Sequence, residues 1–349
     1  MAPHTLPQRF YTSEDVFRAE MDRFFFSCWV CVGRDEQVAK SGDFFLAEIA
    51  GESIIVTRDA AGALRAHYNV CRHRGTRMCT EQSGAFKDGR IRCPYHAWTY
   101  ALDGALVVAP HMEPEFARSE YPLHSVAVES WHGHVFVNLS KTPAPLDLSL
   151  LNFDAWNMGE LRMRKRIHYD VRANWKLIVA NYNECLHCPV LHPALNRLTD
   201  YMGADNAPPS TAWIGGTMGF KAGVETMSTD GKRRREYLPG LSEAQREQVV
   251  YYAILPNLLL SLHPDYIMTH TLWPRAVDRT EIVCELHFHP DERGPINDAV
   301  EFWDLTNRED WRISEQSQLG IGSRAYTPGP YSRREELLHA FDKIVESGA

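Results

Sequence analysis

The apolar positions of the first 150 residues come in short runs that alternate with turn signals, a pattern typical of β-structure. One pair of runs lies at 46–56 and is interrupted by a Gly-Glu turn, and the Asp-Ala-Ala-Gly segment at 59–62 separates two further runs. The Asp-Gly step at 103–104 is a strong hairpin signal. Before these runs, residues 13–28 place apolar side chains at helical spacing. We therefore expect an N-terminal helix followed by a small β domain.

The rest of the chain mixes helical and strand periodicities. Residues 175–186 have helical spacing with no internal breaker, and Pro189 and Pro193 mark the expected end of this helix. A capping-box pattern at Ser332–Glu335 precedes an apolar stripe, which predicts a last helix. The polar, arginine-rich segment 221–237 is expected to be a mobile surface loop and a candidate lid. Three segments are expected to be strands: 251–262, 266–273 and 280–288.

Length and charge limit the class of protein. A chain of 349 residues suggests about two domains, and Pro143–Pro145 is a candidate linker. The formal net charge of −8 argues against nonspecific binding to nucleic acid. No apolar run approaches the roughly 20 residues of a membrane span, and the first residues lack the apolar core of a signal peptide. Eight cysteines in a chain of this length do not indicate a disulfide framework. We therefore expect a cytoplasmic protein.

Two cysteine–histidine pairs carry the clearest chemistry. They are Cys71-Arg72-His73 and Cys93-Pro94-Tyr95-His96, and each offers one thiolate and one imidazole. Two thiolates on one iron and two imidazoles on the other form the ligand set of a Rieske [2Fe–2S] cluster. The alternative is a Cys₂His₂ zinc site, although zinc fingers usually pair cysteine with cysteine along the chain. The order of the ligands favours the cluster.

A second set of metal-binding residue types follows about ninety residues later. His187 is expected in the last turn of the predicted helix and His192 just beyond it, so both imidazoles could reach one metal ion. Two histidines and one carboxylate with open positions form the facial triad of non-haem Fe(II) oxygenases. Two histidines five residues apart are a weak signal alone, but the preceding cysteine–histidine pairs strengthen it. Cys185 and Cys188 flank His187, and we expect them to pack beside the metal site.

These motifs together resemble the α subunit of a Rieske non-haem iron oxygenase, the ring-hydroxylating dioxygenase family in its broad sense. The resemblance covers nearly the whole chain and implies an α+β fold. It implies a small all-β Rieske [2Fe–2S] domain at 38–147 and a catalytic domain with mononuclear iron at 148–349. The catalytic domain is expected to have a helix-grip fold, an antiparallel sheet curled around a long helix. The N-terminal helical segment 1–37 is expected to pack on it.

The resemblance also implies roles for individual residues. The iron histidines of the family fall on His187 and His192. The third iron ligand is expected to be Asp310, and Asp304 competes with it because both could lie on one helix. The cluster ligands of the family fall on four residues: Cys71, His73, Cys93 and His96.

Electron transfer follows from the same resemblance. Glu184 falls where the family has an acid that bridges to a cluster histidine of the neighbouring subunit, and Asn181 falls on its asparagine near the iron. We therefore expect Glu184 to be an inter-subunit electron relay in a homotrimer or a multiple of it. No G-x-G-x-x-G motif opens a helix after a strand, so NAD(P)H is expected to act only through a separate flavin-dependent reductase, with or without a ferredoxin. O₂ is the expected co-substrate.

The substrate is least determined. Residues 318–330 are similar to the branch that oxidises choline, glycine betaine, carnitine and related N-methylated compounds, which favours monooxygenation with N-dealkylation. Dihydroxylation of an aromatic ring is the alternative, and a noncatalytic Rieske electron carrier is the alternative from another class. Aromatic side chains could form a cage for a quaternary ammonium group. The expected pocket residues are Trp213, Phe220, Tyr251, Tyr266 and Trp273.

Overall fold

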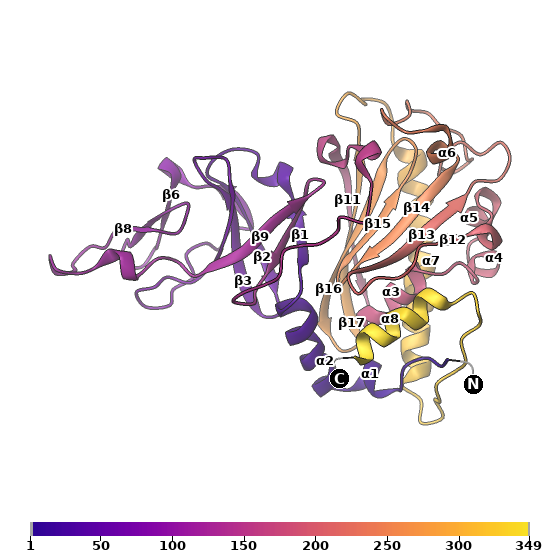
Figure 1. The fold of residues 1–349 in the computed structure, drawn as a ribbon, viewed down its shortest axis with the longest axis horizontal. Coiled ribbons are helices and arrows are strands. Elements are labelled where there is room, and N and C mark those ends of the chain that lie inside the picture. Colours follow the sequence, from indigo (N-terminus) through magenta and orange to yellow (C-terminus); the bar gives the residue numbers. More distant parts are fainter. Residues whose placement is uncertain (1–2, 348–349) are drawn as a thin grey trace. The chain divides into compact units, whose positions relative to one another are not determined.

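The computed structural model describes residues 3–347, which fold into two units (Figure 1). One unit comprises residues 21–146, and the other combines residues up to 20 with those from 147 onward. Each unit contains its own seven-stranded sheet. None of the described helices is long and apolar enough to cross a membrane.

The unit at 21–146 is built on two antiparallel sheets, as the alternating turn signals predicted. The larger sheet has the order β1-β10-β9-β4-β3-β2-β5, and the smaller has the order β6-β7-β8. The Asp-Gly turn at 103–104 joins β7 to β8, which confirms the expected hairpin. The strands are β1 (Val30–Arg34), β2 (Asp43–Ile49), β3 (Glu52–Arg58), β4 (Leu64–Tyr68), β5 (Ser83–Ala85), β6 (Arg90–Arg92), β7 (Thr99–Ala101), β8 (Leu106–Val108), β9 (Ser125–Trp131) and β10 (His134–Asn138).

The β unit begins earlier than the expected boundary at residue 38. The apolar strand β1 pairs antiparallel with β10, so residues 30–34 belong to its sheet. The N-terminal helical segment is divided between the units, because α2 (Glu14–Glu20) clusters with the larger unit and its continuation, Met21–Phe26, with the β unit. Pairing with a distant strand sets this boundary, and local periodicity does not reveal it.

The larger unit has one antiparallel sheet with the order β11-β17-β16-β15-β14-β13-β12. Strands β16 and β17 confirm two of the expected segments. The expectation of one strand over 251–262 is wrong, because a turn that contains Pro256 separates β14 from β15. The strands are β11 (Arg162–Val171), β12 (Asp205–Asn206), β13 (Trp213–Gly219), β14 (Gln248–Ile254), β15 (Leu258–Leu262), β16 (Ile267–Ala276) and β17 (Arg279–Phe288).

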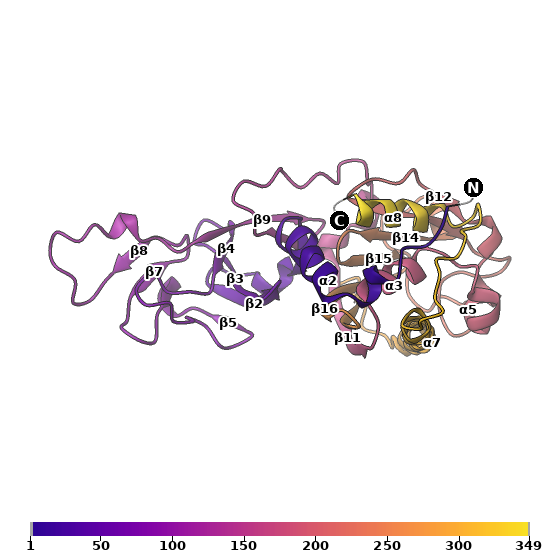
Figure 2. The same ribbon diagram turned by 90° about the horizontal axis from the view of Figure 1, so that it is seen from below.

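A long helix, α7 (Asn297–Ile321), packs against β11 and α3 (Trp175–Tyr182), and Figure 2 views it end-on. Helix α3 ends four residues before the expected position, at Tyr182. The last helix, α8, begins at Glu336, so the predicted capping box does not cap it, although the Glu335 carboxylate accepts a hydrogen bond from the Ser332 backbone N–H. The remaining helices are α1 (Arg9–Thr12), α4 (Cys188–Leu191), α5 (Pro193–Leu198), α6 (Glu243–Arg246) and α8 (Glu336–Glu346).

The arginine-rich segment 221–237 is anchored in the larger unit. Arg235 is 4% exposed and its guanidinium forms ion pairs with Asp265 (2.9 Å) and Asp298 (2.8 Å). The expectation of a solvated mobile loop is therefore wrong for this part of the segment. The buried arginine fixes the loop because leaving either carboxylate without its partner in the interior would be costly.

Candidate functional site

The two cysteine–histidine pairs lie on loops of matching geometry in the β unit. In each loop the backbone N–H four residues after the cysteine donates to the cysteine carbonyl, from Gly75 to Cys71 (3.0 Å) and from Ala97 to Cys93 (3.1 Å). Gly75 and Ala97 both have positive φ, +72° and +57°. A glycine adopts this conformation readily, whereas an alanine does so only when the surrounding structure holds it there. Both loops therefore curl in the same way around a common centre.

The donor atoms of these loops divide into a buried sulfur end and an accessible imidazole end. Cys71 and Cys93 are 3% and 2% exposed and carry free thiols. The rings of His73 and His96 lie 4.6 Å apart between centroids, His73 is exposed and His96 partly so. Burial and the neighbouring Cys71 raise the pKa of the Cys93 thiol, because two thiolates repel each other when no cation lies between them. This donor set suits a cationic centre with sulfur ligands inside and imidazole ligands outside.

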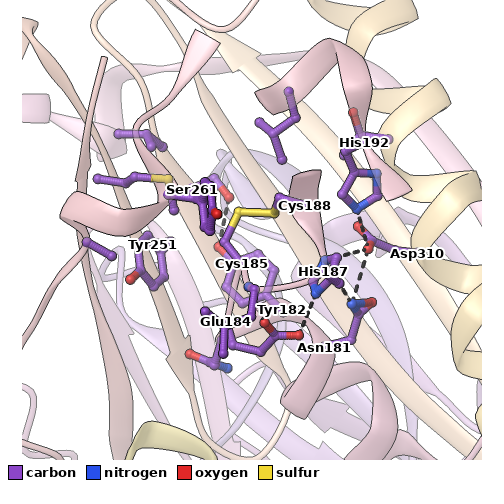
Figure 3. Close-up of a pocket in the computed structure, with 18 of the residues that line it drawn as sticks. Asn181, Tyr182, Glu184, Cys185, His187, Cys188, His192, Tyr251, Ser261 and Asp310 are labelled. Carbon is purple, nitrogen blue, oxygen red and sulfur yellow. Dashed lines mark hydrogen bonds and ion pairs between the residues drawn. A yellow bond between two sulfur atoms is a disulfide. The ribbon is translucent and has the colours of Figure 1, made fainter. Parts of the chain in front are cut away.

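The larger unit brings together the three expected metal ligands, His187, His192 and Asp310 (Figure 3). Their ligand atoms all lie within 4.8 Å of one another. Asp310 Oδ1 lies 2.8 Å from His192 Nε2 and 3.4 Å from His187 Nε2. Asn181 Nδ2 donates to the same carboxylate oxygen at 3.2 Å and lies 3.3 Å from His187 Nε2. The predicted residues therefore converge on one point.

The other ring nitrogen of each histidine faces a second carboxylate. His187 Nδ1 contacts Glu184 Oε1, and His192 Nδ1 lies 2.7 Å from Glu309 Oε2. A carboxylate at Nδ1 holds the proton there and leaves Nε2 free as a metal ligand. Glu184 was expected from the sequence, whereas Glu309 was not. The only local signal for Glu309 was its position next to Asp310.

The electrostatics of this cluster favour a bound cation. Burial opposes the charged imidazolium, but hydrogen bonds to Asp310 and Glu184 raise the pKa of His187 to about 9. Asp310 and Glu309 likewise raise the pKa of His192 against the effect of burial. The carboxylates draw positive charge toward the two rings. A divalent ion between the two Nε2 atoms and Asp310 would supply that positive charge.

Three further details of the site bear on the expectations from the sequence. His187 is not in the last turn of α3 but immediately precedes α4, because α3 ends at Tyr182. Asp304, the competitor for Asp310, instead accepts hydrogen bonds from Tyr169 (2.8 Å) and Arg308 (2.9 Å).

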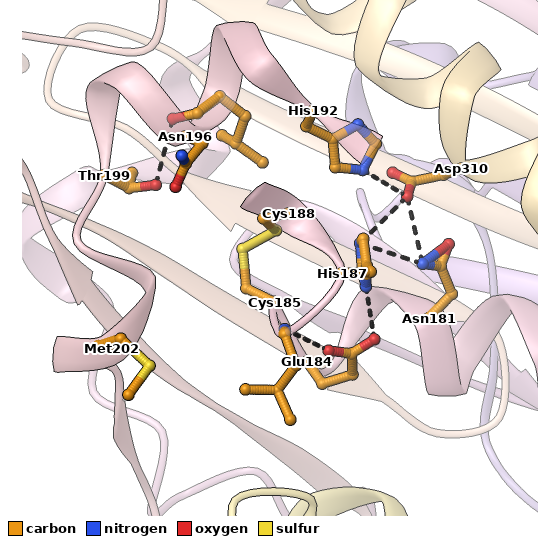
Figure 4. The surroundings of a disulfide bond; sticks show 12 residues. Asn181, Glu184, Cys185, His187, Cys188, His192, Asn196, Thr199, Met202 and Asp310 are labelled. Atoms are coloured by element: carbon orange, nitrogen blue, oxygen red, sulfur yellow. Dashed lines mark hydrogen bonds and ion pairs between the residues drawn. A yellow bond between two sulfur atoms is a disulfide. The ribbon is translucent and has the colours of Figure 1, made fainter. Parts of the chain in front are cut away.

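The third detail concerns Cys185 and Cys188, which were expected to pack beside the metal site. The two cysteines form a disulfide that spans His187, with a Cα–Cα distance of 5.0 Å (Figure 4). The three-residue separation on a tight turn brings both sulfur atoms to the same side.

A cavity of about 230 Å³ opens onto the histidine–carboxylate cluster. The Tyr182 hydroxyl lies 2.7 Å from Ser261 Oγ, and the Tyr251 hydroxyl donates to Asn206 Oδ1 at 3.1 Å. These bonds fix the aromatic rings in the wall. The aromatic and sulfur-containing residues that line it are Tyr182, Tyr201, Tyr251, Trp303, Met218, Met227, Cys185 and Cys188.

Of the five predicted pocket residues, only Tyr251 lines this cavity. Tyr266 lies behind the wall, where its hydroxyl accepts from Trp303 Nε1 at 2.7 Å and donates to the Met227 carbonyl at 2.6 Å. Trp213 packs on Tyr252, while Phe220 and Trp273 are half-buried outside the lining. Trp303 was missed, although it precedes Asp310 by seven residues, or two helical turns, on α7.

Comparisons with known proteins match this architecture. The family model "Ring hydroxylating alpha subunit (catalytic domain)" matches residues 158–347, and "Rieske [2Fe-2S] domain" matches residues 28–132. The glycine betaine monooxygenase oxygenase subunit of Pseudomonas aeruginosa is 30% identical over 95% of this chain and 86% of its own length. The carnitine monooxygenase oxygenase subunit of Escherichia coli is 29% identical over 92% of this chain and 85% of its own length.

A solved structure agrees with these sequence matches. The crystal structure of the quaternary ammonium Rieske monooxygenase CntA in complex with L-carnitine superimposes with a TM-score of 0.83 and 25% identity. The match covers 99% of this chain and 96% of that chain.

Proposed function

The chain belongs to the ring-hydroxylating α-subunit family of Rieske oxygenases, and on that premise we propose that it hydroxylates an N-methylated or quaternary ammonium substrate. Hydroxylation of a carbon next to nitrogen gives a product that breaks down to an amine and a carbonyl compound. The substrate class rests on the relatives named above and on the aromatic cavity beside the metal-binding cluster.

We assign the [2Fe–2S] cluster to Cys71, His73, Cys93 and His96. The buried thiols and accessible imidazoles support this assignment, because a Rieske cluster needs two ligands of each kind on opposite irons. A zinc ion held by all four residues would not require the imidazole end to face outward.

We assign mononuclear Fe(II) to His187, His192 and Asp310. The convergence of their ligand atoms is the observation that carries the proposed function. When bound, this iron and the cluster together supply the activation of O₂ with electrons from a partner. The chain's own residues prepare the site. Glu184 holds the proton of His187 on Nδ1, and the Asn181 amide donates to Asp310 and orients its carboxylate.

Glu184 is proposed as the relay between subunits of a homotrimer, or of a multiple of it. Its carboxylate binds His187 Nδ1, yet its side chain remains 15% exposed. Leu186, on the same loop, and Val190, on α4, are 37% and 88% exposed. Apolar side chains with so much exposed surface beside a metal site are suited to burial by a second subunit. The exposed Tyr95 (56%) next to His96 gives the cluster loops a similar surface.

The cavity wall supports a cationic substrate. The faces of Tyr182, Tyr201, Tyr251 and Trp303 can attract a quaternary ammonium group, by up to about 2 kcal/mol when it is desolvated. The electrons are proposed to come from NAD(P)H through a separate flavin-dependent reductase, with or without a ferredoxin. The need for that reductant supports a cytoplasmic location.

The function is tested with the holoprotein, NAD(P)H and a generic flavin reductase. Glycine betaine, carnitine and their N-methylated analogues are screened by O₂ consumption, and the products are identified by mass spectrometry. The proposal predicts one amine and one carbonyl product per O₂ consumed. A cis-diol that carries two atoms from ¹⁸O₂ would support ring dihydroxylation instead. If neither N-methylated nor aromatic substrates stimulate O₂ consumption, both proposed reactions are contradicted.

The iron assignment is tested with a matched pair of aspartates on α7. Asp310→Ala is expected to lose the mononuclear iron and all turnover while the cluster absorbance stays unchanged. Asp304→Ala, six residues earlier on the same helix, is expected to keep that iron. If Asp304→Ala loses the iron and Asp310→Ala keeps it, the third ligand is Asp304 and not Asp310.

A further inference from the structure

His192 is the more deeply buried of the two histidines at the metal-binding site. Its side chain is 1% exposed, and both of its ring nitrogens face carboxylates. Nε2 lies 2.8 Å from Asp310 Oδ1, and Nδ1 lies 2.7 Å from Glu309 Oε2. Figure 4 shows the His192 ring turned toward Asp310. Glu309 and Asp310 are consecutive residues of α7, so one helix holds the ring through both of its nitrogens.

The contact at Nδ1 selects one form of the ring. A neutral imidazole has one nitrogen that donates a hydrogen bond and one that accepts, and a carboxylate can only accept. Glu309 therefore places the proton of His192 on Nδ1. The lone pair of Nε2 is then available on the side that faces His187 and Asp310.

The two histidines are supported in different ways. Glu184 precedes His187 by three residues, so its contact is local to one loop. Glu309 is 117 residues from His192, so its contact ties the segment between α4 and α5 to α7. Asp310, the third ligand, belongs to α7 as well. Glu309 thus fixes the position of His192, between α4 and α5, relative to Asp310 on α7.

We propose that Glu309 is a positioning residue of the iron site, which holds His192 in the Nδ1–H form with Nε2 directed at the metal. This inference rests on the iron site of the proposed function. Glu309 itself does not reach the metal, since its carboxylate lies on the opposite side of the ring from Nε2. Carboxylates behind metal-binding histidines typically contribute a factor of about 10–100 to metal affinity.

The test measures the release of Fe(II) from the anaerobic holoprotein to an excess of ferrozine. Glu309→Ala is expected to release the mononuclear iron about 10–100 times faster than the wild type. Glu309→Gln keeps an oxygen that can accept from Nδ1–H, so most of the effect should be rescued. Glu301→Gln, an exposed glutamate on the same helix, serves as the matched control and should release iron at the wild-type rate.

Two readouts separate positioning from general damage to the fold. The cluster absorbance of Glu309→Ala should match that of Glu301→Gln. The electron paramagnetic resonance spectrum of the site with nitric oxide as a probe should change in Glu309→Ala and return toward the wild type in Glu309→Gln. An unchanged release rate and an unchanged spectrum in Glu309→Ala would overturn the proposal. A wild-type protein without mononuclear iron would instead overturn the proposed function itself.

Discussion

A buried ion pair holds the start of α3, the helix that carries Asn181. Lys176 Nζ donates to Glu20 Oε2 at 2.6 Å, and the two side chains are 1% and 6% exposed. Trp175 Nε1 donates to the same oxygen at 3.0 Å. Glu20→Gln removes the negative charge and keeps both the size of the side chain and an oxygen that can accept. The substitution therefore isolates what the charge contributes to stability.

The magnitude follows from the pKa of Lys176. Burial lowers the pKa of Lys176 to about 8, although Glu20 opposes this shift. Without the carboxylate the pKa falls further, so below pH 8 the amine must release its proton to stay buried. Each pH unit then costs about 1.4 kcal/mol. The loss at pH 6.5 should exceed the loss at pH 8.5 by about 2 kcal/mol, in addition to about 1 kcal/mol at both pH values for the weakened hydrogen bonds.

The sign is fixed by proton binding. When the pKa of a lysine is lower in the folded state than in the unfolded state, the unfolded state binds more protons between those two values. Stability then rises with pH across that window. Glu20→Gln lowers the folded-state pKa of Lys176 below 8, so the pH range over which stability rises begins at a lower pH. The variant should therefore gain stability relative to the wild type as the pH rises from 6.5 to 8.5.

The assay is the thermal midpoint of the holoprotein at both pH values, at a fixed heating rate. About 1 kcal/mol corresponds to roughly 2–4 °C for domains of this size. The midpoint should fall by about 4–8 °C more at pH 6.5 than at pH 8.5. Glu14→Gln, an exposed position on α2, should show no such dependence on pH. Equal losses for Glu20→Gln at the two pH values would refute the reasoning.

Three further predictions concern the metal site, the disulfide beside it and the arginine-rich segment. Glu184→Gln should keep all the iron and lose turnover, and unchanged turnover would remove the relay role. Peptide mapping of the unreduced holoprotein should recover Cys185 linked to Cys188, and replacing both by serine should cost about 2 kcal/mol for so short a loop; alkylation of both thiols without prior reduction would contradict the link. Arg235→Met leaves the buried Asp265 carboxylate without its guanidinium and should cost about 3–5 kcal/mol, so an unchanged thermal midpoint would contradict the role of that ion pair.

Local motifs were the part of the site most accessible from the sequence. The cluster pairs are short, and their ligand types and order predict the chemistry without knowledge of the fold. His187 and His192 are equally local, but the sequence placed His187 in the last turn of α3, which ends at Tyr182. Asp310 required resemblance to a family, because its neighbours at the metal-binding cluster are more than a hundred residues away in the chain.

Contacts between distant segments account for what was missed. The boundary of the β unit depends on the pairing of β1 with β10, which no local pattern encodes. Tyr266 and Trp273 lie in a segment that was expected to line the pocket, yet only the packing of α7 decides that Trp303 reaches the cavity instead. The anchoring of the arginine-rich loop depends on Asp265 and Asp298, whose proximity to Arg235 is a property of the fold.

The central claim is that one chain holds two iron centres with different ligands. Iron and acid-labile sulfide are measured on anaerobically purified protein, together with the electron paramagnetic resonance spectrum after dithionite reduction. We predict about three irons and two sulfides per chain with the spectrum of a histidine-ligated [2Fe–2S] cluster. Colourless protein that contains zinc, or two irons with no third at His187, His192 and Asp310, would contradict the account.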